Sequence, residues 1–471
     1  MARYILTFTT PGGNYVYDRE VNALLSVSTE EFAAFKRIED GEDREADWVL
    51  LERYTNQGYL HETKLKEIEH PATQFLRNDL ESSMRQITMQ VTQSCNLRCL
   101  YCAYGGSYDH QRTHSNKTMT LETMKKCVDF IMSRSRNIKE IAIGFYGGEP
   151  LLEIDNIVAC IDYINEAYTG RPVHYTVTTN GTVFNDEMVS FLEKNDFTVF
   201  ISLDGPKELH DKNRVFENGK GSFEVIMSNV AYLKTNFPLF FHKVSFITTV
   251  APGSDFSCVR DFYSADSILA NSVARTSTVN TYNSKKEIEY DDLYYITSKY
   301  ERMKVILAEL GLYSRSKTTN IFSNALDTPR RIQKDLSRSV IFEKSHPSGP
   351  CVPGIMRPYM DVNGDIFPCE RVSENSEVMK IGNIDTGFDY AKVESVLNVG
   401  KLSELECKEC WNFIHCSLCV AACDGGSELS SEKRLENCLM AKYETYDALK
   451  TICLLLENGY DFEPSLLNMK G

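Results

Sequence analysis

The chain has 471 residues, 42% of them hydrophobic and 25% charged, which is the balance of a soluble globular protein of roughly three domains. Its formal net charge of -15 argues against nucleic-acid binding, because phosphate contacts need clustered Lys and Arg. No stretch approaches the roughly 18 apolar residues of a membrane span, and the first residues lack the apolar run of a secretory signal peptide. We therefore expect a cytoplasmic protein without membrane contact.

The 15 cysteines are unusual for such a composition. In a reducing cytosol, so many thiols indicate metal binding or catalysis rather than disulfides. Three lie in one short motif, and eight lie between Cys351 and Cys438. The other four are expected to be buried as small hydrophobic residues: Cys127, Cys160, Cys258 and Cys453.

Residues 1–80 are predicted to form a small winged-helix-like module of three strands and a helical pair. The strand patterns occupy Tyr4–Thr9, Tyr15–Tyr17 and Ala23–Val27. Ser28–Glu31 has the sequence of a capping box and begins a helix that Gly41 ends, and a second helix runs from about Glu45 to Asn56. Such a module either caps the next domain or binds an extended peptide at an exposed strand edge.

From Gln86 onward, strands alternate with helices, which is typical of a parallel sheet. Strands are predicted at Gln86–Val91, Glu140–Tyr146, Val173–Thr179, Phe197–Leu203, Lys243–Val250 and about Ser272–Val279. Helices are predicted near Thr120–Ser135, Leu152–Tyr168, Asp186–Lys194, Phe223–Asn236, Ser254–Tyr263 and Asp291–Leu310. This pattern predicts the α/β class and a partial (β/α)6 barrel of the TIM type over residues 86–310. A polar segment, residues 311–346, is expected to bridge to the C-terminal region.

Three cysteines follow the first predicted strand at a C-x3-C-x2-C spacing: Cys95, Cys99 and Cys102. Thiolates that converge from one short loop suit a soft metal centre, and three of them leave one coordination position open. Glycine-containing turns end the next three strands, at Gly147–Pro150, Thr178–Gly181 and Ser202–Pro206. Because barrels place function at the carboxyl ends of their strands, the site is predicted there.

Together these motifs resemble the radical S-adenosylmethionine (SAM) enzymes over about Gln86–Val279. The resemblance implies a [4Fe–4S] cluster on the three cysteines, with SAM bound to its fourth iron through amino and carboxylate groups. It implies Tyr101 beside the adenine, Gly147, Gly148 and Glu149 at the SAM amino group, Ser202 at the ribose and Arg214 at the carboxylate. For Arg214 and Asp204, an ordinary surface or ion-pairing role is the alternative.

Eight cysteines in residues 347–440 are enough for two sites of four thiolates. Zinc is one interpretation, because C-x2-C pairs often bind it, but iron–sulfur is favoured beside a cluster that exchanges electrons. A hairpin with an Asn-Gly turn, Tyr359–Phe367, lies between the first two of these cysteines. The arrangement resembles the SPASM domain of radical SAM peptide maturases, followed by a C-terminal helix in residues 441–471.

The SPASM resemblance implies two auxiliary clusters. It assigns the outer cluster to Cys407, Cys410, Cys416 and Cys438, and the inner one to Cys351, Cys369 and Cys423. The family pattern expects a further cysteine at the position of Val420, so Cys419 is taken as the fourth inner ligand; without it, an open iron could hold a substrate thiol. Eleven cysteines would then fill all but one of the terminal positions of three [4Fe–4S] clusters, leaving one for SAM.

The N-terminal module resembles the RiPP recognition element (PqqD-like), which binds leader peptides of ribosomally made, post-translationally modified peptides. Residues Cys351–Met360 look most like maturases of cysteine-rich peptides, which join a Cys sulfur to a carbon in a thioether (sactipeptide or ranthipeptide type, including freyrasin-like links). The expected partners are a precursor peptide and a flavodoxin- or ferredoxin-type electron donor.

A base must also remove a proton, and Glu370, directly after Cys369, is the predicted catalytic residue. Pairing with Arg371 or Arg357 is its alternative role. Three other functions remain open: a carbon–carbon crosslinking maturase, an anaerobic sulfatase-maturating enzyme, and a zinc-stabilised peptide-binding scaffold without enzymatic activity.

Overall fold

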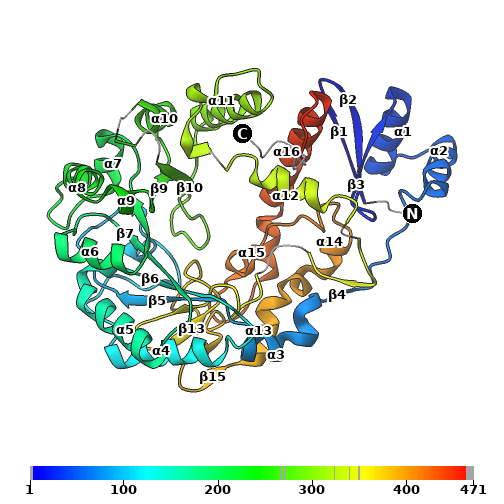
Figure 1. Cartoon of the computed structure of the whole chain (residues 1–471). Helices are drawn as coiled ribbons and strands as arrows, with labels where there is room; N and C mark the ends of the chain where they lie inside the picture. Colours follow the sequence, from blue (N-terminus) through cyan, green and yellow to red (C-terminus); the bar gives the residue numbers. More distant parts are fainter. Residues whose placement is uncertain are drawn as a thin grey trace.

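A sheet of parallel strands forms the middle of the chain in this computed structural model, which describes residues 4–265, 268–269, 272–322, 324–338, 340–347 and 351–462. Six strands pair in chain order, each parallel to the next: β5 (Gln86–Thr92), β6 (Ile141–Gly147), β7 (Val173–Thr179), β8 (Thr198–Ser202), β9 (Val244–Val250) and β10 (Val273–Thr278). The sheet curves, and helices lie along its outer side (Figure 1).

The helices that connect these strands match the predicted alternation. They are α4 (Leu121–Ser133), α5 (Ile154–Ala167), α6 (Asp186–Lys194), α7 (Lys207–Asn213), α8 (Phe223–Asn236), α9 (Pro238–Phe241) and α10 (Phe256–Ala265), with α11 (Asp292–Glu309) after β10. The predicted strands are confirmed to within two residues at each end. The agreement follows from burial, since Ile87, Met89 and Val91 of β5 are fully buried against the helical layer.

The C-terminal region extends this sheet from the free edge of β5. Strand β12 (Tyr359–Met360) pairs parallel to β5, and β13 (Asp365–Phe367), β14 (Gly382–Asn383) and β15 (Gly387–Phe388) follow in antiparallel order. The predicted hairpin is confirmed, and its Gly364 has a φ of 80°, which suits glycine. The pairing places Cys369, just after β13, on the same sheet as the strand that precedes the three-cysteine motif.

The N-terminal module has the predicted strands and helices, and both faces of its sheet are packed. Strands β1 (Ile5–Thr10), β2 (Gly13–Asp18) and β3 (Ala23–Val27) form an antiparallel sheet in that order, followed by α1 (Thr29–Asp40) and α2 (Glu45–Asn56). The capping box is confirmed, since Ser28 and Glu31 exchange hydrogen bonds. One face packs on α1 and α2, and the other packs on the helix α16 (Cys438–Glu457) through Leu6, Phe8 and Tyr17 (Figure 1).

The segment predicted as a polar bridge contains structure. Its helix α12 (Asp327–Asp335) buries Ile332 against the core that β1 and α16 share, and β11 (Lys344–Ser345) pairs with β4 (Glu67–Ile68). Short helices complete the C-terminal region: α13 (Tyr390–Leu397), α14 (Glu404–Lys408) and α15 (Ser431–Glu436). The C-terminal helix begins at Cys438, and residues 463–471 of its predicted range lie outside the described residues. No helix among the described residues is long and apolar enough to cross a membrane.

The four scattered cysteines only partly meet the expectation of burial. Cys127, Cys160 and Cys453 are buried, but Cys258 is exposed. The prediction was wrong for Cys258 because it lies in the first turn of α10, where its thiol donates a hydrogen bond to Asp255 at 3.3 Å.

Candidate functional site

The loop with Cys95, Cys99 and Cys102 leaves the carboxyl end of β5 and is held by backbone hydrogen bonds to a distant segment. The amides of Arg98 and Leu100 donate to the carbonyls of Val215 (2.7 Å) and Asn213 (2.9 Å). These bonds fix the loop against the chain that follows α7, so the three thiols are presented from a rigid turn.

The three thiols lie near one another and are shielded from water. Burial, followed by the charges of Glu149 and of the other two thiols, raises the pKa of Cys95 to about 12. Burial also raises the pKa of Cys99 to about 11, with the Arg214 cation opposing it. Such thiols are protonated on their own, and coordination to a metal ion deprotonates them.

Two glycines let β6 approach this loop. Gly147 has a φ of 135°, and a side-chain carbon on Gly148 would overlap the backbone oxygen of Ser94. In their place, the amides of Gly148 and Glu149 donate to the carbonyls of Thr92 (2.8 Å) and Ser94 (2.9 Å). The glycines are therefore required by backbone contact with the cysteine loop.

The Glu149 carboxylate joins the ends of β6 and β7. It is fully buried and accepts hydrogen bonds from the Asn180 amide (2.7 Å), the Thr179 hydroxyl (2.7 Å) and the Leu151 amide (3.1 Å). Burial raises its pKa to about 7 despite these donors. From the sequence, Glu149 was expected at the SAM amino group. In the structure, both of its carboxylate oxygens accept hydrogen bonds from the protein.

Asp204 connects the predicted adenine and carboxylate contacts. Its carboxylate accepts hydrogen bonds from the Tyr101 hydroxyl, from Arg214 Nε (3.0 Å) and from the Thr249 amide (3.1 Å). Arg214 also lies 3.9 Å from the Cys99 sulfur, with its guanidinium carbon 5.4 Å from the centroid of the Tyr101 ring. Arg214 therefore forms the ion pair with Asp204 that was its alternative role, and it also lies beside Cys99 of the cysteine loop.

His210 forms a hydrogen bond with the backbone of Asp204, a role that the sequence did not indicate. Its Nδ1 accepts a hydrogen bond from the Asp204 amide (3.3 Å), and its Nε2 lies 2.9 Å from the Ser222 hydroxyl, which donates to the Arg214 carbonyl. Burial, with the nearby Arg214 cation, lowers the pKa of His210 to about 3, so the imidazole is neutral.

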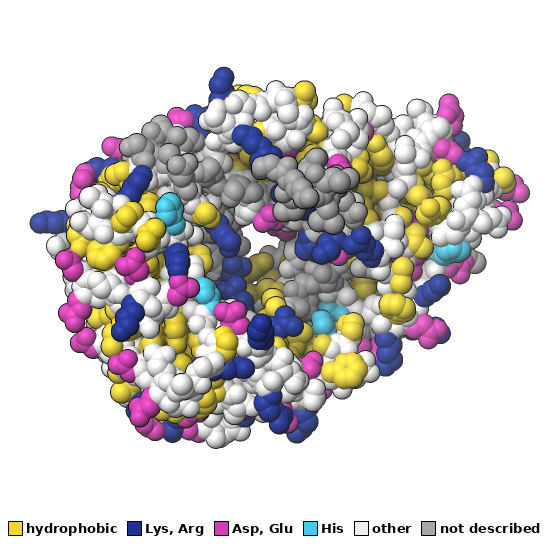
Figure 2. All heavy atoms as spheres, in the orientation of Figure 1, with side chains coloured by type: hydrophobic (Ala, Val, Ile, Leu, Met, Phe, Trp, Pro, Cys, Tyr) yellow, Lys and Arg dark blue, Asp and Glu magenta, His cyan; other side chains and the backbone are white. Residues whose placement is uncertain are grey.

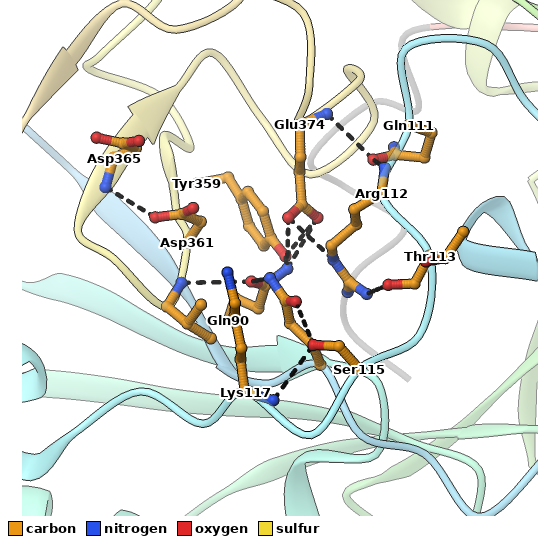
Figure 3. Close-up of polar contacts among 12 residues, drawn as sticks. Gln90, Gln111, Arg112, Thr113, Ser115, Lys117, Tyr359, Asp361, Asp365 and Glu374 are labelled. Atoms are coloured by element: carbon orange, nitrogen blue, oxygen red, sulfur yellow. Dashed lines mark hydrogen bonds and ion pairs between the residues drawn. The ribbon is translucent and has the colours of Figure 1, made fainter. Parts of the chain in front are cut away.

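A buried polar network, also missed from the sequence, lies between β5, the segment after the cysteine loop and the C-terminal region (Figure 3). Gln90 donates to the Tyr359 hydroxyl (2.5 Å) and to both oxygens of Glu374 (2.8 Å each), and Arg112 Nε donates to Glu374 (2.9 Å). The Arg112 guanidinium lies 3.5 Å from the centroid of the Tyr104 ring. The network fixes the C-terminal region against the cysteine loop, and its members are too far apart in sequence to form a motif.

The predicted base Glu370 is mostly buried and lies beside arginines. It pairs with Arg357 and lies 3.9 Å from Arg371, so its alternative partners are both present. Its second oxygen, Oε2, is buried with no hydrogen-bond partner among the described residues. That oxygen remains available to a group that the structure does not hold.

The C-terminal cysteines lie in two neighbouring groups, called the outer and inner sets, and Cys423 of the inner set also lies near Cys407 of the outer set. In the outer set, burial raises the pKa of Cys416 to about 11, with the charges of Cys407 and Cys410 adding, and Cys438 lies near Cys407 and Cys410. The inner set is Cys369, Cys419 and Cys423, whose thiols interact through Cys419. Cys419 lies near both Cys369 and Cys423, whereas Cys351 is exposed at the start of the described C-terminal segment.

Ser202, the predicted ribose contact, is half-buried at the last position of β8. Within the described ranges, no three His, Cys, Asp or Glu side chains have the geometry to hold a single metal ion. A tetrahedral zinc site requires ligands that meet at one ion, whereas a cluster takes one thiolate on each iron.

Comparisons with known proteins agree with this geometry. Residues 89–265 match the model of the radical SAM superfamily, so the chain contains a radical SAM domain. The cysteine-type anaerobic sulfatase-maturating enzyme of Clostridium novyi is 35% identical over 153 residues, which are 32% of this chain and 40% of that protein. The radical SAM cyclopropyl synthase TigE of Paramaledivibacter caminithermalis is 25% identical over 248 residues, covering 48% of this chain and 51% of that protein.

The chain spans between 34% and 57% of the length of the first curated relatives it matches. A cysteine-type anaerobic sulfatase-maturating enzyme of Clostridium perfringens aligns over more of its length, at 22% identity over 73% of this chain and 90% of that protein. The solved structure of native anSMEcpe with bound AdoMet superposes with a TM-score of 0.59 at 19% identity, over 79% of this chain and 99% of that chain. This likeness is one of fold.

The radical SAM superfamily implies a [4Fe–4S] cluster and SAM, and the residues present fit both. Cys95, Cys99 and Cys102 would hold the cluster, because their sulfurs are buried together and Arg214 offers a cation to them. Of the predicted SAM contacts, Gly148 and Glu149 bond to the backbone before the cysteine loop, Arg214 lies beside Cys99, and Ser202 is the last residue of β8.

We predict that Gly148→Ala disrupts this site, because the new methyl group would force β6 away from Ser94. The variant should lose several kcal/mol of stability, about the cost of strain at an overpacked position, and most of the iron bound at the three cysteines. Iron analysis and anaerobic denaturation measure both. Gly105→Ala, in the short segment directly after Cys102, is the control, since its added carbon would come no closer than 3.9 Å to other atoms. Equal iron content in the two variants would contradict the account.

His210 should make the protein less stable as the pH falls. Its pKa lies below that of an unfolded histidine, so only the unfolded chain takes up the proton between pH 7.5 and 5.5. This uptake should cost about 1.4 kcal/mol of unfolding free energy over that range. His210→Gln, which cannot titrate, should flatten the curve by that amount in anaerobic denaturation. Parallel curves for the two proteins would contradict the assigned neutral imidazole.

Proposed function

We propose that this chain is a radical SAM peptide maturase with three [4Fe–4S] clusters, which joins a Cys sulfur to a carbon in a cysteine-rich precursor peptide. The observation that supports the proposal is the proximity of the cysteines within each region: three share the radical SAM loop, and in the C-terminal region Cys438 lies near Cys407 and Cys410 while Cys419 lies near Cys369 and Cys423. A single cluster would suffice to cleave SAM. Two more suit a reaction in which the substrate also loses an electron.

The cofactors would supply a 5′-deoxyadenosyl radical that removes a hydrogen atom from the acceptor carbon. When the thiol sulfur bonds to that carbon, the thiol gives up a proton and the substrate gives up one electron. The electron would pass to the auxiliary clusters, and a flavodoxin- or ferredoxin-type donor would supply the electron that cleaves the next SAM. The peptide thus loses two hydrogens for each thioether.

Glu370 would take the proton. Its Oε2 is buried with no hydrogen-bond partner in the described part of the chain. Glu370 also adjoins Cys369, the proposed inner ligand, and it pairs with Arg357 through its other oxygen. The polar network of Gln90, Arg112 and Glu374 would fix the C-terminal region that carries Glu370 against the radical SAM loop.

The N-terminal module would bind the leader of the precursor. Strand β3 is one of the two edge strands of this sheet, with β1 at the other edge, and no backbone hydrogen bond to the outer side of β3 is found among the described residues. Such an edge accepts an extended peptide by strand addition. The face in Figure 2 is hollowed at its centre, with Lys and Arg side chains around the opening, which would admit the core of the peptide.

An anaerobic sulfatase-maturating enzyme is the second candidate, because relatives of that name cover much of the chain. A carbon–carbon crosslinking maturase needs the same parts. The three products differ: a thioether consumes a thiol and two hydrogens, a carbon–carbon link leaves the thiols free, and formylglycine is an aldehyde. A zinc-stabilised scaffold would bind peptide without reaction.

Serine at Cys95, Cys99 and Cys102 should abolish SAM cleavage and leave the auxiliary iron in place. We expect the wild type to bind about twelve irons per chain and the triple variant about eight, since each cluster holds four. Anaerobic metal analysis and 5′-deoxyadenosine release measure this. Residual SAM cleavage, or about four irons in the wild type, would contradict the proposal.

The reaction is tested by anaerobic turnover with small cysteine-rich peptides as candidate precursors, chosen from any that the genes beside this one encode. The product should be two hydrogens lighter for each link, with one fewer thiol available to alkylation. Glu370→Gln should lower the yield of the link by about tenfold or more while SAM cleavage persists, as for loss of a general base. A lighter product whose thiols all remain alkylatable would replace the thioether by a carbon–carbon link, and an aldehyde would replace it by formylglycine.

A further inference from the structure

Arg434, on α15, is a buried cation without a carboxylate partner. It is 1% exposed, and its guanidinium makes no ion pair with Asp or Glu within the part of the chain that the structure describes. The other deeply buried arginines have such partners: Arg19 pairs with Glu20, Arg112 with Glu374 and Arg214 with Asp204. Arg434 is thus the exception among them.

The side chain lies between the outer and inner cysteine sets. Its Nη1 is 3.9 Å from the Cys423 sulfur, and its Nε donates to the Ser403 hydroxyl at 3.1 Å. That hydroxyl lies 3.3 Å from the Cys407 sulfur. A continuous line of polar contacts therefore runs from an outer cysteine, through Ser403 and the guanidinium, to an inner cysteine.

A buried charge without an opposite charge is expensive, at several kcal/mol for an ion in a protein interior. Guanidinium stays protonated, so the cost is not avoided by loss of a proton. The groups that face it are the Ser403 hydroxyl and cysteine sulfurs. Burial acts against its charge, and negative charge on Cys423, Cys407 and Cys416 favours it. The negative charge that balances Arg434 must therefore come from these cysteines or from an anion that they bind.

We propose that Arg434 is a positioning residue that raises the reduction potential of the auxiliary clusters, above all the one on Cys423. This inference rests on the proposed function, in which both cysteine sets hold iron–sulfur clusters. Hydrogen bonds to the sulfurs and the net charge near a cluster set its potential, and a cation stabilises the reduced, more negative form. In the proposed reaction an inner cluster held by Cys369, Cys419 and Cys423 would accept the electron that the substrate gives up, and the Arg434 guanidinium would favour that transfer.

The test is a potentiometric titration of the anaerobically purified full chain, followed by electron paramagnetic resonance. Arg434→Gln removes the charge and should shift the equilibrium of an auxiliary cluster toward the oxidised form by about tenfold, the size of a charge-assisted hydrogen bond, or about 59 mV for one electron. Arg434→Lys keeps the charge and should retain most of the potential. The signal of the cluster on Cys95, Cys99 and Cys102 should not move.

Lys408→Gln is the matched control. It also removes one cation beside Cys407, but Lys408 is partly exposed and pairs with Glu404 at 2.7 Å, so the potentials should stay at their wild-type values. Unchanged potentials in Arg434→Gln, or the same fall in Arg434→Gln and Lys408→Gln, would overturn the role of Arg434. If Arg434→Gln loses its auxiliary iron, Arg434→Lys decides: retention of iron and potential supports the role, and a lowered potential with full iron overturns it.

Iron analysis separates this inference from the proposed function. About four irons in the wild-type chain would mean that no auxiliary clusters exist, and the proposed function would fail with the inference. About twelve irons in the wild type, with the same cluster reduction potentials in the wild type and Arg434→Gln, would overturn this inference alone.

Discussion

The close approach of β6 to the cysteine loop is the contact on which the rest of the site depends. Gly147 and Gly148 let two backbone amides bond to Thr92 and Ser94, which fixes where the loop leaves β5. The loop in turn positions Tyr101 over the carboxylate of Asp204, and that carboxylate holds Arg214 beside the thiols. A single backbone requirement thus orders cluster ligands and cofactor contacts together.

A buried arginine lies beside the first cysteine set and another lies between the two C-terminal sets, and the two positive charges are balanced differently. Near the first set, Arg214 is neutralised by Asp204, which a neutral His210 supports. Between the C-terminal sets, Arg434 contacts the Ser403 hydroxyl and the Cys423 sulfur and forms no ion pair with Asp or Glu among the described residues. This difference suits the two tasks of the proposed function, in which the first site would position a cofactor and the second would hold an additional electron.

Much of the fold could be predicted from the sequence because local patterns specify it. Val173–Thr179 alternates as a strand and Phe223–Asn236 repeats as a helix, and both were predicted with the observed bounds. The C-x3-C-x2-C spacing likewise indicated a metal site from one short loop. The roles of His210, Glu374 and Arg434 could not be predicted, since each depends on partners brought near by the fold. Helix α12 was missed because its few apolar residues are buried against α16, far along the chain. The exposure of Cys258 likewise depends on which side of α10 meets the sheet.

The central claim is that three sets of cysteines hold three separate iron–sulfur clusters. Crystals of the anaerobically purified protein, measured at the iron absorption edge, test it most directly. The account predicts iron anomalous density at three places: at Cys95, Cys99 and Cys102, at the outer set around Cys407 and Cys416, and at the inner set around Cys369 and Cys423. Iron at the first place alone, with zinc or no metal at the other two, would contradict it.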